Sequence, residues 1–125
     1  MKFYSLLNAS DRPDLSGEYA QARRIGSLAV GSEHLFFRYR LKTFFVPYAD
    51  IRRCYRRVLL VPATMCCGKG ELQAENLVLH NETGEFAQIP LPDTRAAREI
   101  MRLLKERIPG AVFSSPEKEA QAEQK

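Results

Sequence analysis

The chain has 125 residues, of which 45% are hydrophobic and 27% are charged, and its formal net charge is +4. This length suits one domain with a single core, and no apolar run approaches the ~20 residues of a membrane-spanning helix. The apolar stretch at the N-terminus is too short for a signal peptide, and three cysteines, an odd number, argue against a disulfide framework. We therefore expect a cytoplasmic protein, whose basic balance favours acidic partners in general.

Residues 1–18 are expected to form an N-terminal segment outside the main domain. Phe3–Leu7 is compatible with a short edge strand. Asn8–Gly17 is expected to be a loop, because its Asn, Asp, Ser, Pro and Gly residues favour turn geometries. The main domain is expected at residues 19–113, followed by a charged tail at 114–125 that we expect to be disordered.

The stretch that opens the main domain has a mixed pattern. The run Ala20–Arg24 fits the start of a helix, whereas Ile25, Leu28 and Val30 favour a strand. We prefer the strand, and we interpret Gly26 within it as a bulge or a bend.

The most regular pattern follows. Within Leu35–Tyr39, one set of alternate positions holds Leu35, Phe37 and Tyr39, and the other holds Phe36 and Arg38. This period of two is typical of a half-buried strand. A turn over Tyr39–Lys42 leads to a second strand at Thr43–Val46. Pro47 is expected to end that strand, because proline has no N–H to donate to a neighbouring strand.

A short helical or bridging turn then leads to a basic strand at Arg52–Val61. We expect its charged half to be exposed at a rim and its apolar half, Val58–Val61, to lie in the core. The turn-rich segment Pro62–Glu71 is expected to be a loop. Two further strands, Leu72–His80 and Phe86–Leu91, are expected to form a hairpin.

One long helix is predicted at Asp93–Ile108. Asp93 is a favourable N-cap residue, and Pro109-Gly110 ends the pattern. One face carries apolar side chains at helical spacing, which are Ala97, Ile100, Met101, Leu104 and Ile108. The opposite face carries basic side chains, which are Arg95, Arg98, Arg102 and Lys105. The helix is therefore expected to cover a core with one side and to face solvent with the other.

This order of elements, together with the phrase Val46-Pro47-Tyr48-x-x-Ile51, resembles the bacterial pleckstrin-homology-like (PH-like) superfold over residues 19–110. The resemblance implies a mainly β chain, an antiparallel β-barrel or sandwich of six to seven strands capped by one C-terminal α-helix, with Ile51 in the core. Roles within this superfold include lipid binding, peptide binding and scaffolding. The chain has no Trp, unlike the lipid-binding eukaryotic members, so the resemblance brings no ligand with it.

The basic residues around the central strands are the candidate site for an anion or a partner. They are Arg38, Arg40, Lys42, Arg52, Arg53, Arg56 and Arg57. Guanidinium groups bind phosphates and carboxylates through paired donors, and Tyr48 and Tyr55 would add stacking surface. The alternative is that these arginines form a solvated face and pair across strands with Glu33, Asp50 and Glu75.

The segment Cys66-Cys67-Gly68-Lys69-Gly70 matches neither a zinc spacing, a phosphate-binding loop nor a Cys-x-x-Cys redox pair, so we expect a glycine turn. His34 and His80 lie near no nucleophile motif. We therefore expect no enzyme, no metal and no cofactor.

The sequence favours a small cytoplasmic binding or scaffold domain that contacts a protein partner or an anionic lipid surface. The alternative is a nucleic-acid-associated protein that uses the basic strand Arg52–Arg57, against which the interspersed acidic residues argue. The formation of a homo-oligomer is left open.

Overall fold

The computed structural model describes residues 2–7, 13–62 and 71–115. The expected glycine turn with Cys66 and Cys67 and the last ten residues of the expected tail lie outside the described residues. Neither helix in the described ranges has the length and the apolar character that crossing a membrane needs.

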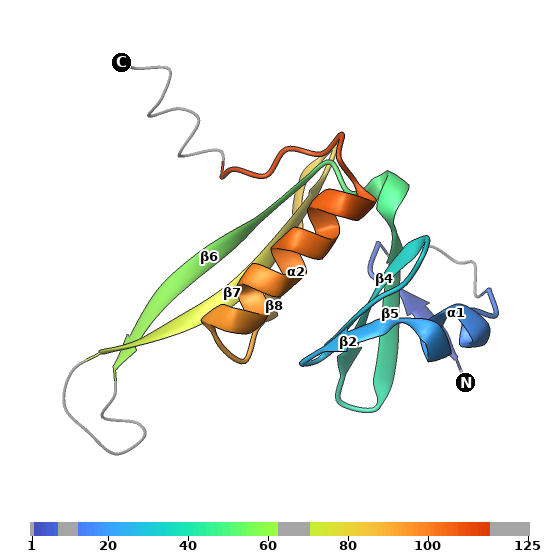
Figure 1. Cartoon of the computed structure of the whole chain (residues 1–125), viewed down its shortest axis with the longest axis horizontal. Coiled ribbons are helices and arrows are strands. Elements are labelled where there is room, and N and C mark those ends of the chain that lie inside the picture. Colours follow the sequence, from blue (N-terminus) through green and yellow to red (C-terminus); the bar gives the residue numbers. More distant parts are fainter. Residues whose placement is uncertain (1, 8–12, 63–70, 116–125) are drawn as a thin grey trace.

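Two sheets and a C-terminal helix make up the fold (Figure 1). The elements are β1 (Phe3–Ser5), α1 (Ser16–Gln21), β2 (Arg23–Ile25), β3 (Leu28–Val30), β4 (His34–Tyr39), β5 (Lys42–Pro47), the 3-10 turn η1 (Tyr48–Asp50), β6 (Arg53–Pro62), β7 (Glu71–Asn81), β8 (Gly84–Pro90) and α2 (Thr94–Arg107). The first sheet has the order β1-β5-β4-β3-β2, and the second has the order β6-β7-β8. All neighbouring strands are antiparallel except β1 and β5, which are parallel.

The prediction of a mainly β chain with a C-terminal helix is confirmed, but the two sheets do not close into a barrel. The described residues form eight strands, whereas six to seven were expected. One reason lies at Gly26, where the chain has φ +59 and reverses direction, so that the single strand expected through Ile25–Val30 is a hairpin of β2 and β3. A Cβ at Gly26 would also lie 2.9 Å from a ring atom of Pro92, which favours glycine at this turn.

The sequence pattern does not predict α1, because only Ala20–Arg24 fits the start of a helix and Asn8–Gly17 has the composition of a loop. The helix begins at Ser16, whose N–H and hydroxyl both donate to the Asp14 carboxylate, at 3.1 and 2.7 Å. Tyr19 is the buried residue of this helix. It packs edge-on against Phe36, with ring centroids 5.1 Å apart, and so anchors α1 to the first sheet.

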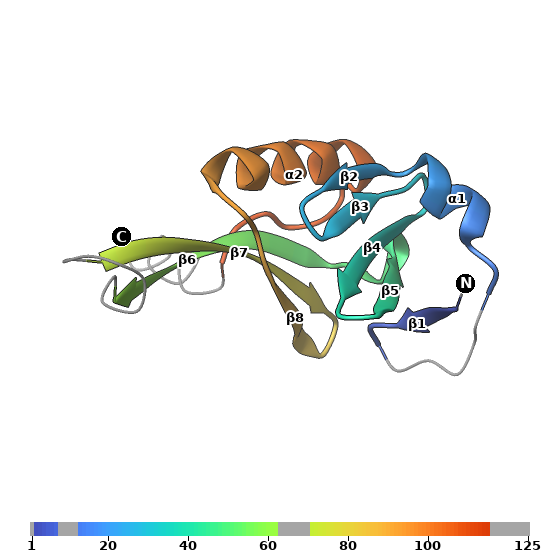
Figure 2. The ribbon, with the colours of Figure 1, turned by 90° about the horizontal axis from the view of Figure 1, so that it is seen from below.

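The main core lies between the two sheets and α2 (Figure 2). Its largest fully buried members include Leu28, Leu35, Leu77, Leu79, Ile100 and Leu104. The expected helix face is largely confirmed, since Ala97, Ile100 and Leu104 are buried and Met101 is half-buried. The N-cap prediction is also confirmed, because the Asp93 side chain accepts a hydrogen bond from the N–H of Ala96 at 2.7 Å. A second, smaller cluster of Phe3, Tyr19, Ala29, Phe36 and Phe45 lies on the other face of the first sheet.

The prediction that the apolar half of β6 lies in the core is wrong. Cys54 and Tyr55, in the charged half, are buried, whereas Val58, Leu59 and Leu60 expose 45%, 40% and 62% of their surface. The cause is the length of β8, which pairs with Asn76–Asn81 only and leaves the outer part of the β6–β7 pair uncovered. Val58–Pro62 and Glu71–Glu75 therefore form a two-stranded arm, which extends past β8 and α2 in both views (Figures 1 and 2).

Candidate functional site

The structure places six of the seven basic candidates in two groups with different surroundings and leaves Lys42 apart from both. The four arginines of the β6 region all contact groups of the chain itself. Arg52 pairs with Glu82 at 2.9 Å, and Arg53 donates to the carbonyl oxygen of Ser114 at 2.6 Å. Arg57 pairs with Glu85 at 3.0 Å and also donates to Gln88 at 2.6 Å.

Arg56 makes the most enclosed of these contacts. Its Nη2 and Nε atoms donate to the two carboxylate oxygens of Glu75, at 2.6 and 3.1 Å. The Glu75 side chain is only 3% exposed, and Thr94 at the start of α2 donates to it at 3.1 Å. The hydrogen bonds from Arg56, followed by that from Thr94, outweigh desolvation and lower the pKa of Glu75. The expected cross-strand pairing with Glu75 is thus present, and it ties the second sheet to α2.

The second group surrounds a hollow on the first sheet. Its lining residues, which include no carboxylate, are Tyr19, Arg24, Gly26, Ser27, Leu28, Ala29, Arg38 and Arg40, and its volume is about 300 Å³. Within the described ranges, Arg24, Arg38 and Arg40 form no ion pair. No described carboxylate therefore neutralises the positive charge at this hollow.

Strand register explains why Arg24 joins this group. Arg24 lies opposite Ala29, and Ala29 lies opposite Phe36, so all three point to the same face of the sheet. Arg38 is two residues beyond Phe36 and shares that face. The helix α1 covers the adjoining part of the face through Tyr19 and leaves the arginine end open.

Two of the three arginines have unusual local structure. Arg24 contacts an aromatic ring, and Arg40 has a positive φ. The Arg24 guanidinium lies 4.4 Å from the centre of the Tyr19 ring and donates to its hydroxyl at 2.8 Å. This contact holds the charge in place through cation–π attraction. Arg40 occupies the β4–β5 turn with φ +58, a conformation that favours glycine and costs a side-chain-bearing residue about 1 kcal/mol or more.

Lys42 belongs to neither arrangement. It lies opposite Tyr39, on the sheet face away from Arg38, and its ammonium group lies 5.2 Å from the centre of the Tyr4 ring. The sequence thus identified Arg38 and Arg40 of the hollow and missed Arg24. No local signal in the sequence marks Arg24, because only the register of β2, β3 and β4 brings it to the others.

A second recess lies between β6 and α2 and has a volume of about 520 Å³. Its lining includes Tyr55, Arg56, Arg98, Met101, Lys105 and Phe113. Arg56 is held there by Glu75, and the Lys105 ammonium lies 5.8 Å from the centre of the Phe113 ring. The basic face of α2, expected to be fully solvated, thus borders a recess.

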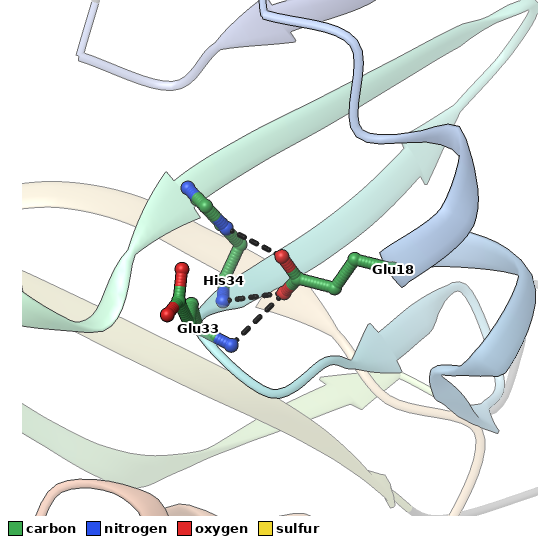
Figure 3. Close-up of side chains that lie close together, drawn as sticks. All are labelled: Glu18, Glu33 and His34. Carbon is green, nitrogen blue, oxygen red and sulfur yellow. Dashed lines mark hydrogen bonds and ion pairs between the residues drawn. The ribbon is translucent and has the colours of Figure 1, made fainter.

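Glu18, Glu33 and His34 are the group of described side chains that comes nearest to a metal site, with ligand atoms within 4.8 Å of one another (Figure 3). Both Glu18 oxygens are already used. One accepts from the backbone N–H groups of Glu33 and His34, at 3.0 and 2.7 Å, and the other lies 2.8 Å from His34 Nδ1. Desolvation raises the pKa of Glu18, but these hydrogen bonds together bring it below its usual value. The cluster therefore anchors α1 to the β3–β4 turn.

Cys54 is the described cysteine, and it is buried in the main core. Burial raises the pKa of its thiol to about 12, despite the opposing effect of the Lys105 charge. A thiol with such a pKa is a poor nucleophile at neutral pH.

Comparison with protein-family models, with curated proteins and with solved structures found no match for this chain.

Proposed function

We propose that this chain is a non-enzymatic binding domain of PH-like type, which contacts a phosphate-bearing anionic surface through the hollow of Arg24, Arg38 and Arg40. The PH-like assignment is supported by the order of elements. An antiparallel meander of β2–β5 is followed by a second meander of β6–β8 and then by α2.

The observation that carries the proposal is the set of three guanidinium groups around one hollow without an ion pair in the described ranges. Like charges that converge in this way repel one another, and the β4–β5 turn adds the backbone cost of Arg40. An anion would relieve the repulsion, and guanidinium groups fit phosphate oxygens through paired donors. The contact between Arg24 and Tyr19 fixes one of the donors in advance, which lowers the entropy cost of binding.

The β6 strand supports the nucleic-acid alternative less well. Arg52, Arg53, Arg56 and Arg57 each have a partner within the chain. An incoming phosphate would have to displace that partner before it could bind. We therefore base the proposal on the hollow.

The test compares vesicles of phosphatidylserine and phosphatidylcholine with vesicles of phosphatidylcholine alone, in a co-sedimentation assay at low salt. The substitutions Arg24→Gln, Arg38→Gln and Arg40→Gln are combined in one variant. At roughly 1 kcal/mol for each basic residue near an anionic membrane, the variant should bind about 100-fold more weakly than the wild type.

The matched control combines Arg52→Gln, Arg95→Gln and Arg102→Gln, three exposed residues that do not line the hollow. It removes the same charge, so it should weaken binding far less if the hollow is the site. Equal losses in the two variants would show that net charge alone attracts the membrane. Competition by soluble pyrophosphate distinguishes recognition of free phosphate from recognition of a lipid surface.

A further inference from the structure

The arm of β6 and β7 leaves apolar side chains in water on both faces. Val58 and Leu60 point to one face and Leu59 to the other, because strand residues alternate. Their exposed fractions, from 40% to 62%, are far above those of the core. A long apolar edge strand is a liability that proteins usually blunt with charge or cover. The described part of the arm shows neither remedy between Val58 and Leu60.

Among the described residues, the backbone groups along the outer edge of this stretch of β6 have no hydrogen-bond partner. The N–H of Cys54 points to that edge, since it donates to the carbonyl oxygen of Val112 at 2.9 Å. By alternation, the N–H and C=O groups of Arg56, Val58 and Leu60 point the same way. The bridge to Val112 ends at Cys54, and no strand in the described ranges pairs with the edge beyond it.

We propose that this edge pairs with the same edge of a second copy of the chain, in an antiparallel two-fold arrangement centred on Leu59. In a two-fold pair, a residue with outward N–H must face another such residue. With Leu59 opposite Leu59 of the second copy, Val58 and Leu60 of each copy exchange both backbone hydrogen bonds with Leu60 and Val58 of the other. The proposal goes beyond the anion-binding function and does not depend on it.

Other centres fit less well. A centre at Leu60 would place Val58 opposite Pro62, which has no N–H to give. A centre at Val58 would place Pro62 opposite Cys54, whose N–H is already bonded to Val112. The Val58 centre would also place Arg56 opposite Leu60 and Arg57 opposite Leu59. Only the Leu59 centre pairs Val58, Leu59 and Leu60 with one another and uses the donors of both Val58 and Leu60.

Charge also favours a second copy as the occupant. In the Leu59-centred register, Arg57 lies opposite Val61 and Arg56 lies opposite Pro62, so no arginine faces an arginine. The pairs between Val58 and Leu60 and between the two Leu59 residues are apolar on both sides. Apolar cross-strand pairs stabilise a sheet, whereas like charges directly opposite destabilise it. The strand is thus complementary to itself.

Sedimentation velocity on the full chain, from about 1 µM to about 1 mM, tests the pairing. The wild type should show a reversible monomer–dimer equilibrium, weak because the contact is short. Leu59→Glu and Leu59→Arg should each weaken dimerisation at least tenfold, because each places like charges opposite one another. An equimolar mixture of the two variants should recover a dimer, since glutamate then faces arginine.

The control is Leu41→Glu at the β4–β5 turn, where Leu41 is 95% exposed and outside the arm, and it should dimerise like the wild type. A second variant, Val58→Arg with Leu60→Glu, tests the register without changing Leu59. It should dimerise, whereas Leu60→Glu alone should not. Cooperative melting of each variant establishes that it is folded.

A wild type that stays monomeric up to the highest concentration overturns the proposal and leaves a foreign strand as the occupant of the edge. Failure of the mixed Leu59 variants to recover a dimer would overturn the Leu59-centred arrangement. Dimerisation that survives every substitution in the arm would place the interface elsewhere.

Discussion

The ion pair between Arg56 and Glu75 should be the most stabilising polar contact of the described structure, and Glu75→Gln tests it. The substitution keeps the shape of the side chain and removes its charge. One hydrogen bond to a charged group contributes about 1.5–3 kcal/mol to the free energy of unfolding. Removal of one partner of a fully buried ion pair costs about 3–5 kcal/mol. The Arg56 side chain is 33% exposed, so water screens it and partly replaces the lost partner. We therefore expect a loss of about 2 kcal/mol.

The assay is urea unfolding at pH 7, with thermal melting as a second measure. A loss of about 2 kcal/mol should lower the melting temperature by about 8 °C for a domain of this size. The control is Glu82→Gln, which removes the exposed partner of Arg52 and should cost at most about 1 kcal/mol. Equal losses for the two variants would refute the reasoning, because it depends on the burial of Glu75.

The pH dependence supplies a second check with a definite sign. The pKa of Glu75 is lower in the folded chain than its ordinary value of 4.5, so the folded state favours the carboxylate. Its contribution is complete above the ordinary pKa and is lost as the pH falls through the folded-state pKa. The gap in stability between the wild type and Glu75→Gln should therefore be full at pH 6 and narrow below about pH 4.5. A gap that stays constant down to pH 3 would show that charge is not its origin.

Two further predictions concern the core. Leu104→Ala should cost about 2–5 kcal/mol in urea unfolding, because Leu104 is fully buried, whereas Leu41→Ala at a 95% exposed position should cost almost nothing. The thiol of Cys54, with its pKa raised to about 12 by burial, should resist iodoacetamide at pH 8 in the folded chain and react in urea, as peptide mapping by mass spectrometry can follow. Rapid alkylation of Cys54 without denaturant would contradict its placement in the core.

Local patterns were sufficient for the elements whose signal lies within a few residues. The alternation in Leu35–Tyr39 identified β4, and the N-cap Asp93 with its apolar stripe identified α2. The same reasoning missed α1, because Ser16 and Gly17 have the composition of a loop. The hydrogen bonds from Ser16 to Asp14 and the packing of Tyr19, which stabilise this helix, depend on the folded structure.

The features that the sequence did not predict depend on contacts between residues that lie far apart in the chain. The exposure of Val58–Leu60 depends on where β8 stops along β7, which no property of β6 encodes. The candidate site shows the same limit. A row of arginines is visible in the sequence, but whether each has a carboxylate partner depends on strand register. That register gives Arg56 its Glu75 and leaves Arg38 without a carboxylate among the described residues.

The position of α2 has a consequence for the order in which the chain acquires its structure during synthesis. The helix supplies Ala97, Ile100 and Leu104 to the core that joins the two sheets, and the segment after it bonds to β6 through Val112. The eight strands of the described ranges all precede this helix in the chain, so a nascent chain carries two apolar sheet faces without their cover. Such faces bind chaperones and one another. Translation speed through residues 94–112 should therefore affect the yield of soluble protein more than speed elsewhere.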